Sequence, residues 1–403
     1  MMKIHALVLS LACCLSAIAQ EARWIGTWAA APQTPWESAQ LLEGKTVREI
    51  VHTSVGGTKL RLRISNRYGD SPLQIAAAHV AVRSQGSEIR SGTDHPISFS
   101  GRASVWIPIG ADWISDEVSM QVQDSADLAV SFYFEKATFV LTQHNGALHG
   151  NVVASGDQTS AERLSGEVEE IGASPFLSGI EVVPADARGG IVTLGDSITD
   201  GSAAQGASNH RWPDLLAARL LESKKRYGVM NLGISANRLL RDGAPNVRYG
   251  PGANAVVRIE NDLLARAGVT HVIVLEGVND LGHPGSSQPL SETVTAEDLE
   301  SAYTQMTRLA QEHGIKIYIG TILPFEGTTY PGYYSTAKEQ VRQSVNRWIR
   351  ESRLFDGVID FDAALRDPSH PARMLPEYDS GDHLHPNDRG TQAMADAVPL
   401  SFF

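Results

Sequence analysis

Hydrophobic and polar residues alternate with a period of two across the first half of the chain. In residues 59–64 the three apolar side chains fall on one face of a strand and the three basic side chains on the other. Further strand candidates are 48–55, 73–82, 103–109, 118–122 and 128–134. Short strands separated by Gly, Pro, Asn and Asp turns predict an antiparallel β-sandwich, jelly-roll-like, of roughly 150 residues.

After Gly190 the pattern changes to apolar runs that alternate with longer helical stretches. The predicted strands are 191–194, 229–232, 271–275, 316–322 and 357–361, and the predicted helices are 212–224, 254–267, 296–312 and 336–352. Apolar runs without polar interruptions are typical of parallel strands that are covered on both faces. We therefore predict a β-sandwich domain over 20–185 and an α/β domain over 186–403, linked by the Pro/Ala/Gly-rich stretch 184–190.

Composition and charge narrow the class of protein. The chain has 403 residues, 42% hydrophobic and 20% charged, which is the composition of a globular protein and long enough for two domains. The net charge of −12 argues against nucleic acid or an anionic membrane surface as a partner. It favours a neutral substrate and leaves the oligomeric state open.

The first nineteen residues predict a signal peptide. Lys3 precedes an apolar run over 6–17, and Ala17-Ile-Ala19 is a small-x-small cleavage site. The run is too short for a permanent membrane span, so we expect a secreted or periplasmic protein; a buried N-terminal helix is the alternative. Both cysteines, Cys13 and Cys14, fall in this segment. A lipid-modified cysteine stays open, but a cleaved chain would have no disulfide and no thiolate.

The candidate chemistry centres on Gly195-Asp-Ser197, which follows the first predicted strand of the α/β half. Carboxyl ends of parallel strands share one edge of the sheet, where ligands bind, so we expect catalytic groups after other strands too. A serine needs a neighbouring base to act as a nucleophile. His385 is the candidate base, and Asp382, three residues earlier, is placed to bond its Nδ1–H and fix the tautomer.

The same edge offers donors for an oxyanion. Gly233 follows the second strand and offers a backbone N–H, Asn279 follows the third and offers a side-chain amide, and Ser197 offers its own N–H. The alternative for the last block is a metal site of His383 and His385 beside Asp382. No further ligand stands at recognisable spacing, so we expect neither a metal nor another cofactor.

These blocks resemble the SGNH/GDSL hydrolases. The motifs are Gly-Asp-Ser-Ile-Thr-Asp-Gly at 195–201, the Gly233 loop, Gly-Val-Asn-Asp at 277–280 and Asp-x-x-His at 382–385, and the likeness covers about 187–403. It implies a flavodoxin-like three-layer α/β/α sandwich and metal-free ester hydrolysis. It also implies a Ser197–His385–Asp382 triad with an oxyanion hole from Ser197, Gly233 and Asn279. The second glycine of a Gly-x-Ser-x-Gly elbow is missing, which argues against an α/β-hydrolase.

The first half adds a second likeness. Residues 24–32 and 65–69, with Arg-Trp-Pro-Asp at 211–214, resemble an exported two-domain branch similar to xylan-esterase-like proteins. This implies a serine esterase that removes short acyl groups, acetyl above all, from a small-molecule or polysaccharide ester. The alternatives are a lipase or broad esterase and a non-catalytic carbohydrate-binding protein. The polar insertion 282–293 is unlike an apolar lid and favours a sugar substrate.

Aromatic and histidine residues of the first half leave further alternatives. Five of the seven tryptophans lie here, at positions 24, 28, 36, 106 and 113. They fit a carbohydrate-binding face, but core or interface packing is the favoured interpretation. His144 and His149 could reach the site of the second half, although we expect a solvated loop for each.

Overall fold

The computed structural model describes residues 23–147, 150–204, 208–243, 250 and 252–403. The predicted signal peptide over 1–19, with Cys13 and Cys14, and also His149 lie outside the described residues. Across the described ranges no helix is long and apolar enough to cross a membrane.

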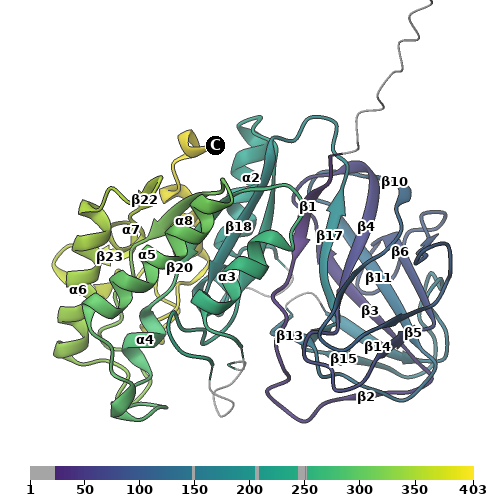
Figure 1. Ribbon diagram of the computed structural model, residues 1–403, viewed down its shortest axis with the longest axis horizontal. Coiled ribbons are helices and arrows are strands. Elements are labelled where there is room, and N and C mark those ends of the chain that lie inside the picture. Colours follow the sequence, from purple (N-terminus) through teal and green to yellow (C-terminus); the bar gives the residue numbers. More distant parts are fainter. Residues whose placement is uncertain (1–22, 148–149, 205–207, 244–249, 251) are drawn as a thin grey trace, which may run out of the picture.

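The second half contains a parallel sheet made of the five predicted strands. They are β18 (Gly189–Gly195), β19 (Tyr227–Gly233), β20 (Val269–Leu275), β21 (Lys316–Gly320) and β22 (Gly357–Ile359). Every neighbouring pair is parallel, in the order β19-β18-β20-β21-β22 (Figure 1). In chain order this is 2-1-3-4-5, the flavodoxin-like arrangement. The prediction of an α/β fold is therefore confirmed.

Helices cover this sheet in two packed groups. The four predicted helices form as α2 (Trp212–Glu222), α3 (Ala255–Leu264), α5 (Ala296–Glu312) and α6 (Thr336–Glu351). The pattern did not predict the shorter α1 (Ser197–Asp200), α4 (Val278–Gly282) and α7 (Phe361–Leu365), or α8 (Asp388–Ala397). α2 packs with α8, whereas α5 packs with α3 and α6. Every residue of β18 is buried, as expected for a strand with both faces covered.

The first half forms two antiparallel sheets around their own core. One sheet has the order β1-β17-β4-β10, with β9 on β4, and the other has the order β15-β14-β3-β11-β6-β7. Their strands are β1 (Ile25–Ala29), β3 (Lys45–His52), β4 (Gly57–Ser65), β6 (Ala77–Val82), β7 (His95–Pro96), β9 (Asp112–Ile114), β10 (Val118–Val122), β11 (Asp127–Phe134), β14 (Asn151–Ser155), β15 (Val168–Ile171) and β17 (Leu177–Val182). The antiparallel β-rich prediction fits, and the jelly-roll topology stays a prediction.

One predicted strand of this half is divided into two in the structure. The strand predicted over 73–82 is broken at Ala76 into β5 (Leu73–Ile75), which pairs with β8 (Val105–Ile107), and β6, which belongs to the six-stranded sheet. The break lets one continuous apolar run serve two sheets. Shorter ladders, β2 (Leu41–Leu42) with β12 (Thr138–Phe139) and β13 (Gln143–Asn145) with β16 (Ala173–Pro175), complete the half.

The strand β1 connects the two halves. It pairs with β17, where Ile25 lies opposite Val182, and it packs along β19 (Figure 1). Ala29 and Ala31 belong to the core cluster of the α/β half. The Gly26 amide donates to the carbonyl of Ala267 at 2.9 Å. The predicted link 184–190 is shorter than expected because its last two glycines already belong to β18. The boundary at 185/186 stays a prediction.

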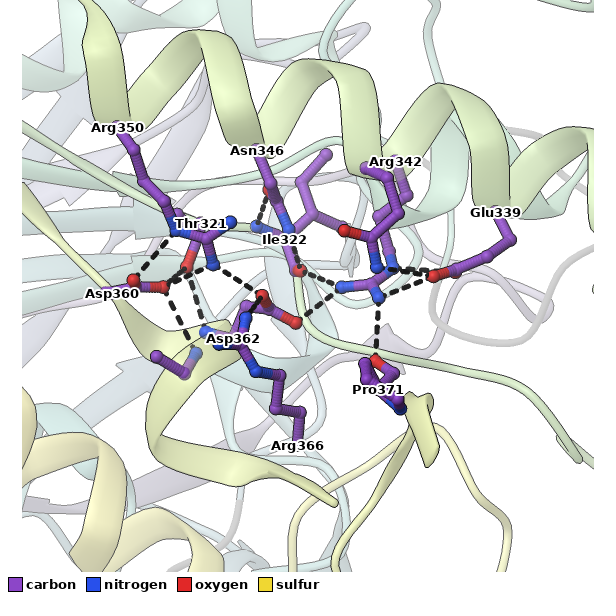
Figure 2. Close-up of polar contacts among 12 residues, drawn as sticks. Thr321, Ile322, Glu339, Arg342, Asn346, Arg350, Asp360, Asp362, Arg366 and Pro371 are labelled. Atoms are coloured by element: carbon purple, nitrogen blue, oxygen red, sulfur yellow. Dashed lines mark hydrogen bonds and ion pairs between the residues drawn. The ribbon is translucent and has the colours of Figure 1, made fainter. Parts of the chain in front are cut away.

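A buried ionic cluster ties helix α6 to the end of β21 and to α7 (Figure 2). Arg342 is fully buried and donates to Asp362 Oδ1 at 2.7 Å and to the carbonyl of Ile322 at 2.9 Å. Asp362, also fully buried, accepts from Arg350 and Arg366 as well. The cluster thereby fixes α7 against α6. The chain that follows α7 leads to the last predicted catalytic block, 382–385.

We expect Asp362→Ala to lower the free energy of unfolding by about 3–5 kcal/mol, since it leaves a buried guanidinium short of its counter-charge. Urea denaturation followed by circular dichroism measures the loss. The matched control is Asp396→Ala, which removes an exposed carboxylate 3.1 Å from Arg219. It should cost less than about 1 kcal/mol. Equal losses in the two variants would contradict the prediction.

Candidate active site

Ser197 lies at the carboxyl edge of the sheet, where the strand order reverses. β18 ends at Gly195, and α1 begins at Ser197 with Asp196 as its N-cap, whose side chain accepts the Ile198 amide at 2.9 Å. The chain after β18 leads to α2, whereas the chain after the neighbouring β20 leads to α5 in the other helix group, so a crevice opens here between their loops. The short helix explains why the sequence pattern showed only a turn.

The three residues of the predicted triad are connected by hydrogen bonds. Ser197 Oγ lies 2.9 Å from His385 Nε2, and His385 Nδ1 lies 2.5 Å from Asp382 Oδ2. Ser197 and His385 are both buried to more than nine-tenths, yet both line an open cavity. A proton on Nδ1 directs the lone pair of Nε2 at the serine hydroxyl, which is the arrangement that general-base activation needs.

Asp382 is held in place by its own loop. Its Oδ1 accepts the backbone amides of Leu384 at 2.9 Å and His385 at 2.8 Å, which leaves Oδ2 to face the imidazole. Burial alone would raise the pKa of this carboxyl. The hydrogen bond and charge of His385, with those backbone amides, outweigh burial and hold the pKa well below its usual range. Asp382 therefore stays ionised at any working pH.

The loop that carries Asp382 and His385 does not follow the last strand directly, although the sequence predicts that it does. Helix α7 and the hairpin of β23 (Arg366–Asp367) and β24 (His370–Met374) intervene before Asp382. His383, the other member of the possible metal pair, is half-exposed and bonded to Asp379 instead. Within the described ranges no group of three or more His, Cys, Asp or Glu side chains is placed to hold a metal ion.

Asn279 reaches the same cavity from α4, directly after β20. The Tyr333 hydroxyl donates to its Oδ1 at 2.7 Å, and its Nδ2 donates to the Asn237 carbonyl at 2.9 Å. An amide nitrogen carries two protons, so one N–H is left for a ligand. Burial raises the pKa of Tyr333 well above its usual value and keeps the hydroxyl a donor. Tyr333 was missed because the sequence offered only a tyrosine-rich loop beyond the fourth strand.

Gly233 ends β19, as predicted, but its amide already has an acceptor within the chain. Its amide donates to Asn231 Oδ1 at 2.9 Å, and it does not belong to the lining of the cavity. A Cβ here would meet the Asp200 amide nitrogen at 2.3 Å, so the glycine lets β19 pack against α1. Ala236, three residues further, lines the cavity with a φ of +61°, and its amide donates to no other described residue. Gly233 is thus poorly placed as an oxyanion donor, whereas Ala236 is well placed.

Three buried carboxyl groups lie within three residues of Ser197 or Asn279 in the sequence. Burial raises the pKa of Asp196 to about 7, that of Asp280 to about 6 and that of Glu276 well above its usual value. Arg258 passes between the ends of β18 and β19 and donates to the carbonyls of Gly195 at 3.1 Å and Leu232 at 2.7 Å. Raised pKa values reduce the negative charge near the site, which would otherwise repel an oxyanion.

His144 is not in a solvated loop, so that expectation is wrong. It lies in β13, is more than nine-tenths buried, and contacts Asp200 of α1.

The tryptophans of the β-rich half divide between core packing and an exposed aromatic face. Trp28 and Trp113 pack against the core of the β-rich half, whereas Trp106 is 53% exposed beside Lys136.

The cavity has a volume of about 370 Å³, and its lining combines apolar surface with polar side-chain groups. Besides the residues above, hydroxyl groups and an imidazole reach it from four loops: Ser202, Ser235, His283, Ser286, Ser287 and Tyr330. Burial lowers the pKa of His283 to about 4, so this ring is neutral at neutral pH. The arrangement joins a base-activated hydroxyl, N–H donors and hydroxylated walls, and it suits attack on a small polar acyl compound.

Comparisons with known proteins agree on the α/β half. The model of the GDSL-like lipase/acylhydrolase family matches residues 193–393. Among solved structures the half is similar to a carbohydrate acetylesterase from Sinorhizobium meliloti (15% identity, 52% of this chain and 96% of that chain, TM-score 0.38). It is also similar to the M. smegmatis aryl esterase (15% identity, 52% of this chain and 95% of that chain, TM-score 0.40). A third similar structure is a GDSL-like lipase from Bacteroides thetaiotaomicron (15% identity, 53% of this chain and 87% of that chain, TM-score 0.37). A search of curated proteins found no match.

Proposed function

Since residues 193–393 belong to the GDSL-like lipase/acylhydrolase family, we propose that this protein is an exported serine esterase. Its substrates are short acyl esters, acetyl above all, of polysaccharides or oligosaccharides. The observation that carries the mechanism is the 2.9 Å contact between Ser197 Oγ and His385 Nε2 within the cavity. The hydroxyl and imidazole groups along the lining support an ester of a hydroxylated compound such as a sugar. Export rests on the N-terminal sequence alone.

In the proposed reaction Ser197 Oγ attacks the ester carbonyl carbon while its proton passes to His385 Nε2. Asp382 stabilises the imidazolium that forms. The N–H groups of Ser197 and Ala236 and the amide of Asn279 stabilise the oxyanion. The carbon–oxygen bond to the sugar then breaks, and the imidazolium gives its proton to the departing alkoxide. Water attacks the acyl-serine in the same way, releasing the carboxylic acid and restoring the hydroxyl of Ser197.

A panel of p-nitrophenyl acetate, p-nitrophenyl palmitate and acetylated xylan tests the substrate class. One methylene too many in a close-fitting pocket costs roughly 10–200-fold in kcat/KM. We therefore expect the acetate to exceed the palmitate by more than about 100-fold, with measurable release of acetate from xylan. Palmitate cleaved as fast as acetate would favour a lipase. A chelator added to the same assay should leave the rates unchanged, and inactivation would revive the metal interpretation of His383 and His385.

A further inference from the structure

A chain of three buried hydrogen-bonded side chains runs from the β-rich half to the active-site cavity. His144 Nε2 lies 3.0 Å from Asp200 Oδ1, and its Nδ1 lies 3.1 Å from the carbonyl of Ala31. Asp200 Oδ2 in turn accepts from Ser235, from the hydroxyl at 2.8 Å and from the amide at 3.2 Å. All three side chains are more than nine-tenths buried. Figure 1 places β13, the strand of His144, on the side of the β-rich half that faces the α/β half.

The end of this chain is a strained turn. The Asn237 amide donates to the Ile234 carbonyl at 2.9 Å, so Ser235 and Ala236 are the central residues of a four-residue turn. Ala236 adopts a φ of +61°, which favours glycine and costs an alanine free energy. Such a conformation persists only where neighbouring contacts enforce it. The two bonds from Ser235 to Asp200 are contacts of that kind, since they fix both the backbone and the side chain of the preceding residue.

We propose that His144, Asp200 and Ser235 are positioning residues that hold the Ala236 amide toward the oxyanion of the proposed esterase reaction. The β-rich half thus contributes to catalysis through His144 without touching the substrate. The two ring nitrogens of His144 face one oxygen atom on each side, the Ala31 carbonyl of the β-rich half and the Asp200 carboxylate of α1. Removing this support lets Ala236 relax to negative φ, which turns its N–H away from the cavity. The inference rests on the proposed function and extends it to a second part of the chain.

Kinetics of p-nitrophenyl acetate hydrolysis test the proposal. Loss of one oxyanion donor costs roughly 10²–10³-fold in kcat, so partial misplacement in His144→Leu or Asp200→Ala should cost about 10–100-fold with KM unchanged. Asp200→Asn is the matched control. Its amide oxygen can still accept from Ser235, and its NH₂ group stays within hydrogen-bond reach of His144 Nε2, so we expect kcat within about fivefold of wild type. Equal losses in Asp200→Asn and Asp200→Ala would overturn the positioning role.

Rescue provides the sharper readout. Glycine takes positive φ without steric cost. Adding Ala236→Gly to His144→Leu should therefore raise kcat at least about tenfold over His144→Leu alone. A merely structural role of His144 would not give this rescue. If His144→Leu does not fold, Ser235→Ala takes its place, since it removes the 2.8 Å bond to Asp200 and a 3.4 Å contact with Ser202 but keeps the amide bond to Asp200. We expect that variant to lose about 3–10-fold in kcat, again recovered by Ala236→Gly. Failure of the rescue in either background would overturn the proposal.

Ser197→Ala in the same assay separates the two proposals. If Ser197→Ala keeps wild-type turnover, the proposed function fails and the positioning role fails with it. If Ser197→Ala is inactive while folded His144→Leu keeps full kcat, the positioning role alone is wrong and the esterase mechanism stands.

Discussion

Ser197→Ala should lower kcat on p-nitrophenyl acetate by roughly 10⁴–10⁶-fold, with little change in KM. The variant removes the atom that forms the acyl-enzyme and leaves the rest of the cavity as it is. What remains is the rate from the oxyanion donors and binding alone, which in other serine hydrolases still exceeds that in water. The side chain is small and the alanine fits the first turn of α1, so folding should be unaffected.

Two measurements make this prediction specific to Ser197. Ser223→Ala, at an exposed position that follows α2, should keep wild-type kinetics. A fluorophosphonate should add its mass to the wild-type protein and to Ser223→Ala but not to Ser197→Ala. Labelling of Ser197→Ala, or turnover within tenfold of wild type, would show that another group is the nucleophile.

Asp382→Asn should lower kcat by about 10⁴-fold, although the loop keeps its shape. The amide oxygen of the new side chain has to take the place of Oδ1, which accepts the amides of Leu384 and His385. Its NH₂ group then points at His385 Nδ1 and can only donate. The imidazole is forced to carry its proton on Nε2, where it can no longer accept the proton of Ser197.

The same loop holds a matched control for this substitution. Asp379 pairs with His383 and likewise accepts two backbone amides, from Gly381 at 2.8 Å and from His383 at 3.0 Å. Asp379→Asn should therefore change kcat by less than about fivefold, since His383 does not contact Ser197. Because the pKa of Asp382 is held below its usual value of about 3.9, the gap between the two variants should persist from pH 5 to 9. Equal losses in both variants would argue against the triad.

Long periodic elements could be predicted from the sequence, and short or polar ones could not. The five parallel strands and four amphipathic helices were found because each has an apolar run or stripe long enough to set a period. Helix α1 has four residues, too few to show any periodicity, so Ser197 was expected in a turn. Strand β13 is Gln-His-Asn, and its burial depends on partners that lie far away in the sequence.

The candidate site shows the same division. Ser197, Asn279, Asp382 and His385 stand in recognisable motifs at strand ends, and the structure brings them to one cavity. Gly233 was chosen as a donor because glycine leaves its amide accessible, but its neighbours Asn231 and Asp200 occupy that space. Ala236 gave no signal, because a positive φ at alanine is imposed by tertiary contacts and not by the residue itself. Tyr333 and His144 act through contacts that only the folded chain creates.

Strand β1 also has a consequence for the order in which the chain folds. It is the first of the strands to be synthesised, but its hydrogen-bonding partner β17 comes at the end of the β-rich half and its packing partner β19 comes later, in the α/β half. Contacts between segments so far apart form late, because a long loop must close before they are gained. Until then Ala29 and Ala31 remain uncovered. During synthesis β1 therefore stays exposed for longer than the other strands, and we expect the contact between the two halves to form last.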